Sequence, residues 1–147
     1  MRPNPRRLVG LALVALVGAV AACSSTAAPP TITEAWARPA PAGGNTAAYL
    51  TITAAAGQAE SLLSASSPAA DMVQVHEVST DTSGMTGMHP IDRLDIPAGS
   101  SVTLKPGGFH LMVMGVKREL TVGASIELAL VFEHAGRIVV QAEIRQG

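Results

Sequence analysis

Apolar and polar residues alternate singly along several short stretches of the chain, and this period of two is typical of β-strands. The clearest example lies near the C-terminus, where large apolar side chains occupy every second position from Ile126 to Phe132. The turn sequence His134-Ala135-Gly136 follows, and a second strand-like run begins directly after it. The pattern predicts a β-hairpin at the end of the chain.

Similar short runs recur along the chain, and turn sequences rich in Pro and Gly separate them. No long stretch has helical periodicity. Many short strands at this spacing indicate an all-β fold, a β-sandwich of the immunoglobulin-like Greek-key kind. The predicted strands are Thr31–Arg38, Asn45–Ala54, Ser61–Ser66, Met72–Ser79, Met88–Ile96, Ser101–Leu104, Phe109–Val116, Ser125–Glu133 and Arg137–Arg145.

The N-terminus has a different pattern, in which three arginines precede the uncharged stretch Leu8–Ala22. This stretch is shorter than the roughly 20 apolar residues that a membrane span needs. Small residues at its end complete the pattern of a signal peptide over residues 1–22. Residues 23–30, which end in Pro29-Pro30, are interpreted as a flexible tether, and residues 31–147 as a single folded domain.

Cys23 is the only cysteine in the chain and follows Val20-Ala21-Ala22, which resembles the lipobox of bacterial lipoproteins. In a lipobox this cysteine is lipidated and becomes the mature N-terminus. Each buried acyl CH2 contributes about 0.8 kcal/mol, so several chains would hold the domain at a membrane surface. We therefore expect an extracytoplasmic, lipid-anchored protein in the periplasm or at the cell surface. The alternative is an ordinary signal peptide followed by a free cysteine.

Charge and cysteine content exclude several classes of function. Removing residues 1–22 takes Arg2, Arg6 and Arg7 from the ten basic residues and leaves seven, against eleven acidic ones. This mildly acidic balance argues against nucleic acid as a partner. With no cysteine beyond Cys23, the folded domain offers no disulfide, zinc finger or thiolate nucleophile. No other nucleophile motif or carboxylate pair is evident, so we expect that the protein is not an enzyme. We also expect it to be a monomer.

Histidines and methionines gather in one part of the chain. All five methionines that follow the signal peptide, and three of the four histidines, lie between residues 72 and 114. In a strand, His110, Met112 and Met114 would share one face, opposite Leu111 and Val113. One interpretation is that this face is a second buried face that happens to be rich in methionine. The other is that the imidazole and the two thioethers are soft metal ligands.

His76 follows the same rule, because alternation separates it from Val73 and Val75 and places it on the polar side of its strand. Thioether sulfur and neutral imidazole together suit Cu(I), whereas zinc prefers thiolate, imidazole or carboxylate. A blue-copper electron carrier would need a cysteine thiolate in the site. The segment from residue 72 to residue 114 therefore favours a Cu(I) site over a zinc site or a blue-copper site.

Several segments resemble the periplasmic copper chaperone family called PCuAC, and the resemblance extends from about residue 31 to residue 144. That family has a cupredoxin-like β-sandwich and binds Cu(I) through two histidines and two methionines. The segments that carry the resemblance are Ala37–Pro39, Ala47–Ile52, Ala65–Ala70, Val75–Glu77, Gly87–Pro90 and Leu104–Met112.

By this resemblance the implied ligands are His76, Met88, His110 and Met112. The family spacing of twenty-one residues separates Met88 from His110. Eleven residues separate His76 from Met88, one more than in the family pattern, and we place the extra residue in the loop 80–84. Met85 remains an alternative to Met88.

The other candidates are interpreted as supporting residues. Alternation turns His89 away from Met88, so His89 is expected outside the ligand set or exposed to solvent. Met72 and Met114 are interpreted as packing residues or as cover around the site, because methionine is a common filler of apolar gaps. His134 is expected on the surface.

The resemblance implies an extracytoplasmic metallochaperone that carries Cu(I) and delivers it to a cuproprotein. In the family the implied recipient is the CuA centre in subunit II of cytochrome c oxidase. The alternative is a metal-free surface lipoprotein that acts as an adhesion or assembly module, which would explain the anchor and the sandwich equally well.

Overall fold

The computed structural model describes residues 28–147, and every regular element in that range is a β-strand. Among these residues no helix is long and apolar enough to cross a membrane. The predicted signal peptide and Cys23 lie outside the described residues. The strands are β1 (Thr31–Ala37), β2 (Thr46–Thr53), β3 (Glu60–Ser66), β4 (Ala70–Thr80), β5 (Thr86–Pro90), β6 (Leu94–Ile96), β7 (Ser101–Leu104), β8 (His110–Val116), β9 (Ser125–Phe132) and β10 (Gly136–Ile144).

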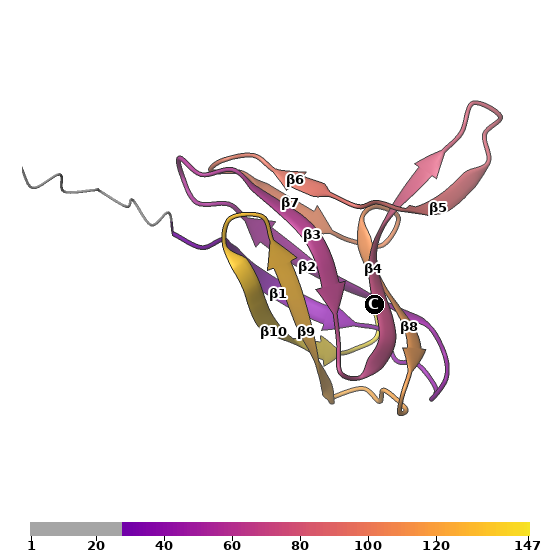
Figure 1. The fold of residues 1–147 in the computed structure, drawn as a ribbon. Coiled ribbons are helices and arrows are strands. Elements are labelled where there is room, and N and C mark those ends of the chain that lie inside the picture. Colours follow the sequence, from indigo (N-terminus) through magenta and orange to yellow (C-terminus); the bar gives the residue numbers. More distant parts are fainter. Residues whose placement is uncertain (1–27) are drawn as a thin grey trace, which may run out of the picture.

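The strands pair in the order β5-β4-β8-β2-β1-β10-β9-β3-β6, and β3 also pairs with β4 where Ala65 faces Val73. This extra pairing closes the strands from β4 round to β3 into a ring that is flattened into a sandwich (Figure 1). β1 and β10 run parallel, and the other pairs are antiparallel. The predicted all-β sandwich is confirmed.

Alternating side chains form the core of the sandwich, as the hydrophobic pattern predicts. Val73 and Val75 of β4 are buried, and Leu111 and Val113 of β8 are fully enclosed beside them. The predicted C-terminal hairpin is present as β9 and β10, with Ile126 to Phe132 supplying buried residues from β9. Burial of each such aliphatic side chain contributes about 1.5–3 kcal/mol, so this face sets the register of the strands.

The single strand predicted over Met88–Ile96 is wrong, because the chain changes partner inside it. β5 pairs with β4, whereas β6 pairs with β3. Pro90 ends the first strand, since it has no backbone N–H to donate to the ladder, and residues 91–93 lead across to the second. β4 and β5 together form a hairpin that extends beyond the rest of the sandwich (Figure 1).

Candidate metal site

His76 and His110 are brought side by side by the pairing of β4 with β8. The two residues are directly opposed in the antiparallel register, and their ring centroids lie 5.6 Å apart. When two imidazoles bind one ion, each metal–nitrogen bond is about 2 Å long and each ring adds its own radius. The two ring centroids can then lie about 6 Å apart. The spacing therefore permits both rings to bind the same ion.

The imidazole of His110 is almost completely buried, with 4% of its surface exposed. Its Nδ1–H donates to the carbonyl oxygen of Gly108, at 3.1 Å, in the turn that precedes β8. A ring that donates from Nδ1 keeps the lone pair of Nε2 free. Main-chain hydrogen bonding thus fixes both the orientation of the ring and the nitrogen that can bind a metal.

The imidazole of His76 is partly buried, and its Nε2 lies 3.2 Å from the side-chain oxygen of Gln74. Its Nδ1 is buried and has no hydrogen-bond partner among the described residues. Burial lowers the pKa of His76, and electrostatic repulsion from the neighbouring His110 and then His89 lowers it further. The neutral ring, which is the metal-binding form, is therefore favoured.

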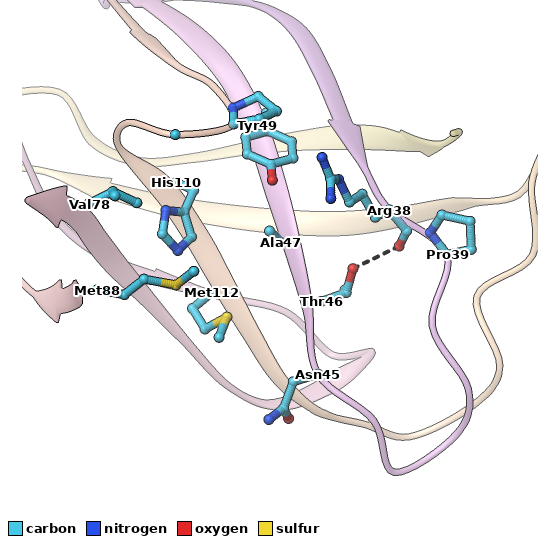
Figure 2. Close-up of a pocket in the computed structure, with 12 residues that line it drawn as sticks. Arg38, Pro39, Asn45, Thr46, Ala47, Tyr49, Val78, Met88, His110 and Met112 are labelled. Carbon is cyan, nitrogen blue, oxygen red and sulfur yellow. Dashed lines mark hydrogen bonds between the residues drawn. The ribbon is translucent and has the colours of Figure 1, made fainter. Parts of the chain in front are cut away.

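An open cavity of about 470 Å³ lies against these strands and includes three of the four predicted ligands in its wall. Figure 2 shows Met88, His110 and Met112 grouped at one end of this cavity. Met112 comes from β8, where it is opposed to Gln74 of β4 and to Ala47 of β2. The remaining lining residues are Arg38, Pro39, Asn45, Thr46, Ala47, Tyr49, Val78, Pro106 and Gly107.

Met88 reaches the cavity from the projecting hairpin, where it is opposed to Val78. Its side chain is 57% exposed, so it forms the solvent side of the group. Met85 lies in the turn of the same hairpin, is 71% exposed and does not line the cavity. The geometry therefore favours Met88 over Met85 as a donor.

His89 points to the other face of the hairpin, where it is opposed to Glu77, and it is exposed. The turn before Met88 is held by Asp81, whose carboxylate accepts hydrogen bonds from the N–H and hydroxyl of Ser83 and from the N–H of Met85. The loop in which the extra residue is predicted to lie is thus an ordered turn.

Met72 and Met114 are directly opposed on β4 and β8, two positions beyond Gln74 and Met112. Met72 is 52% exposed, so it is not a core packing residue, and the alternative that it covers the site stays a prediction. The cavity also includes Tyr49 and Arg38, which were not among the predicted site residues. No local pattern identifies these residues, because strand pairing alone brings β1 and β2 to the site.

The donor set determines which ions the site can hold. Within residues 28–147, no group of three or more His, Cys, Asp or Glu side chains is arranged to bind a metal ion. Any ion held here would depend on thioether sulfur beside imidazole nitrogen. Such a set favours a soft monovalent ion over zinc, magnesium or calcium.

Comparison with known proteins agrees with this description. The LpqE-like family, described as "Putative lipoprotein LpqE-like", matches residues 30–144. A relative from Leifsonia xyli subsp. xyli, named "Putative lipoprotein Lxx21020", is 35% identical over 101 residues. That match covers 69% of this chain and 60% of the relative, so the chain spans about three-fifths of the relative's length.

Two solved structures share the fold and confirm the resemblance to PCuAC domains. The copper-bound PCuAC domain from PmoF2 has a TM-score of 0.67 at 26% identity, covering 82% of this chain and 96% of that domain. The solution structure of CuI-DR1885 from Deinococcus radiodurans has a TM-score of 0.63 at 32% identity, covering 85% of this chain and 84% of that one.

Proposed function

Since this chain belongs to the LpqE-like family and has the fold of PCuAC domains, we propose that it is a Cu(I) carrier that works outside the cytoplasm. The proposed ligands are His76, Met88, His110 and Met112. The observation that carries the proposal is the cavity in which two thioethers meet His110, with the ring of His76 beside it. Structures of copper-bound relatives with this fold support the choice of ion.

The geometry suits an ion that must be bound selectively and then released. Both imidazoles belong to paired strands of the ring, whereas Met88 is exposed and belongs to the hairpin. Neutral donors leave the bound ion with its full single charge, and no proton has to be displaced from a thioether. We therefore propose a carrier and not an enzyme.

The proposed recipient is a cuproprotein, most specifically the CuA centre of cytochrome c oxidase. Lipidation of Cys23 would restrict the carrier to the membrane surface and raise its effective concentration near a membrane-embedded acceptor. Anaerobic transfer of copper from the loaded protein to a purified CuA domain tests this step. Retention of copper by the carrier would reject CuA as the recipient.

Cu(I) binding itself is tested by anaerobic titration of the apo-protein against a competing Cu(I) chelator. We expect a sub-micromolar Kd, and a loss of affinity greater than about 100-fold in His110→Ala combined with Met112→Leu, since loss of outer-shell partners alone typically costs 10–100-fold. Met85→Leu is the matched control, because it removes an exposed thioether from the same hairpin. If wild type and the double variant both fail to compete with the chelator, the metal-free adhesion or assembly module becomes the better assignment.

A further inference from the structure

Met72 and Met114 form a second pair of thioethers on the same face of the sheet as the proposed copper ligands. They are directly opposed on β4 and β8, and such cross-strand pairs have Cβ atoms about 5 Å apart. On β4, alternation puts Met72 on the same face as Gln74 and His76. On β8, it puts Met114 on the same face as Met112 and His110. One face of two paired strands therefore carries all of these side chains.

Core packing does not explain the pair. The opposite face of the same strands fills the core, with Val73 and Val113 buried against the rest of the sandwich. Met72 is 52% exposed, and Met114 is only partly buried. An exposed methionine opposed to a half-buried one gains little from burial, although a single exposed apolar residue would need no explanation.

The pair is close to the proposed site. Two residues along a strand span about 7 Å, so Met114 lies one such step from Met112 and two from His110. Asn45, which lines the cavity, accepts a hydrogen bond from the N–H of Gly115 beside Met114. The cavity wall and the methionine pair are therefore continuous along β8.

The surroundings of the pair favour a soft ion. Asp71 is adjacent to Met72 in sequence, and its carboxylate lies against Gly115, the residue after Met114. The amide oxygen of Asn45 is already engaged by a backbone N–H. The amide of Gln74 is the next polar side chain on this face. Two uncharged thioethers suit Cu(I) or Ag(I) over hard divalent cations, which require several oxygen ligands.

We propose that Met72 and Met114 form a second, weaker site for a soft monovalent ion, from which Cu(I) passes to or from the ligands around His110. This inference rests on the proposed function. In the inward transfer the two thioether–copper bonds of the pair are broken as bonds to the imidazoles and thioethers of the primary ligands form, and the outward transfer is the reverse. All of these donors are neutral, so copper remains Cu(I) and no electron or proton is released. A two-donor site binds more weakly than a four-donor site, so the pair would hold the ion only transiently on its way into or out of the ligands around His110.

Titration with Ag(I), monitored by NMR of methyl-labelled methionines, tests the pair in the full-length folded domain. We expect the first equivalent to shift the methyl signals of Met88 and Met112, and further Ag(I) to shift those of Met72 and Met114. Met85 provides the internal control, because its exposed thioether has no opposed methionine. The methyl signal of Met85 should not shift with the first equivalent of Ag(I) or with further additions.

The possible outcomes separate this inference from the proposed function. If Met88 and Met112 do not respond, the proposed primary site fails. If they respond and Met72 and Met114 do not, only the second site fails. Equal movement of Met85 would mean that exposed thioethers bind Ag(I) indiscriminately, and this also rejects the second site.

A variant carrying Met72→Leu and Met114→Leu provides the functional test. We expect unchanged Cu(I) affinity at the primary site, loss of the second phase with Ag(I), and several-fold slower copper transfer to an acceptor domain. Leucine preserves the apolar volume, and Met72 is exposed, so the fold should be retained. Unchanged transfer rates would overturn the role of the pair in copper movement.

Discussion

His76 and His110 face each other across β4 and β8, with ring centroids 5.6 Å apart. The register that creates this pair is the one that buries Val75 and Leu111 on the opposite face. A slip of one residue between the strands would exchange the faces and separate the imidazoles. The hydrophobic core therefore positions the two rings, and their meeting does not depend on bonds between them.

The proposed site should discriminate strongly between soft and hard ions. Two imidazoles and two thioethers match Cu(I) and Ag(I), whereas Zn(II) would lack the thiolate or carboxylate that it prefers. We expect Ag(I) to compete with Cu(I), and Zn(II) to leave Cu(I) binding unchanged at equal concentration. Competition measured anaerobically by chelator absorbance checks this expectation. Displacement of Cu(I) by equimolar Zn(II) would contradict the assigned donor set.

Asp81 should influence copper affinity although it lies outside the cavity. Its carboxylate organises the β4–β5 turn through hydrogen bonds to Ser83 and Met85, with distances of 2.6–3.0 Å. Asp81→Ala should loosen the hairpin that carries Met88, lowering Cu(I) affinity several-fold and increasing hydrogen exchange in β5. Thr82→Ala, a neighbouring change in the same turn, is the control. Equal affinity in both variants would show that turn order does not matter for binding.

Gly115 should resist substitution more than a glycine in an open turn. Its φ is +64°, and a Cβ added there would lie 2.5 Å from the carboxylate of Asp71. Gly123 also has a positive φ, of +89°, but an added Cβ would meet no atom within 4 Å. Both alanine variants should lose about 1 kcal/mol to backbone strain, and Gly115→Ala should lose more. Urea unfolding of the two variants measures the difference, and equal losses would mean that Asp71 moves aside freely.

Acid should weaken the network around Arg93. Hydrogen bonds from Ser61 and then Arg93 lower the pKa of Asp95, and a hydrogen bond from Arg93 lowers the pKa of Glu133. The unfolded chain therefore takes up protons at higher pH than the folded protein. The stability from these carboxylates is present near neutral pH, begins to fall near their ordinary pKa of about 4, and is lost as the pH drops through their lowered folded-state pKa values.

Arg93→Gln should reduce this acid-dependent loss, because the pKa of Glu133 would return toward its ordinary value. Ser61 would still hold the pKa of Asp95 down, so part of the dependence should remain. Thermal unfolding at pH 7 and at pH values near 4 provides the comparison. The same fall in Tm with pH in wild type and variant would contradict the role assigned to Arg93.

Much of the fold could be predicted from local patterns, since alternation at Val73 and Val75 or at Leu111 and Val113 reports directly which face is buried. The break near Pro90 was missed because residues on both sides favour strands, and only long-range pairing shows that they join different partners. Local patterns also placed His110 and Met112 on one face.

Those patterns could not establish which strands would be neighbours, and this decides the rest of the cavity. Tyr49 and Arg38 have no distinctive spacing relative to the histidines, and they reach the cavity wall because β2 pairs with both β1 and β8. The exposure of Met72 likewise depends on whether another segment of the chain packs over this face of β4, which the local sequence pattern does not show. Resemblance to a family with a known ligand pattern supplied the relation between His76 and Met88, which periodicity alone does not contain.

The closed circuit of strands has a mechanical consequence. Three of the proposed donors belong to strands paired on both sides, while Met88 belongs to β5, which pairs with β4 alone. An acceptor that pushed the hairpin aside could remove one sulfur from the ion without disturbing the other three donors. Beyond His76, β4 pairs with β5 alone, so unloading would require only the outer part of this hairpin to bend.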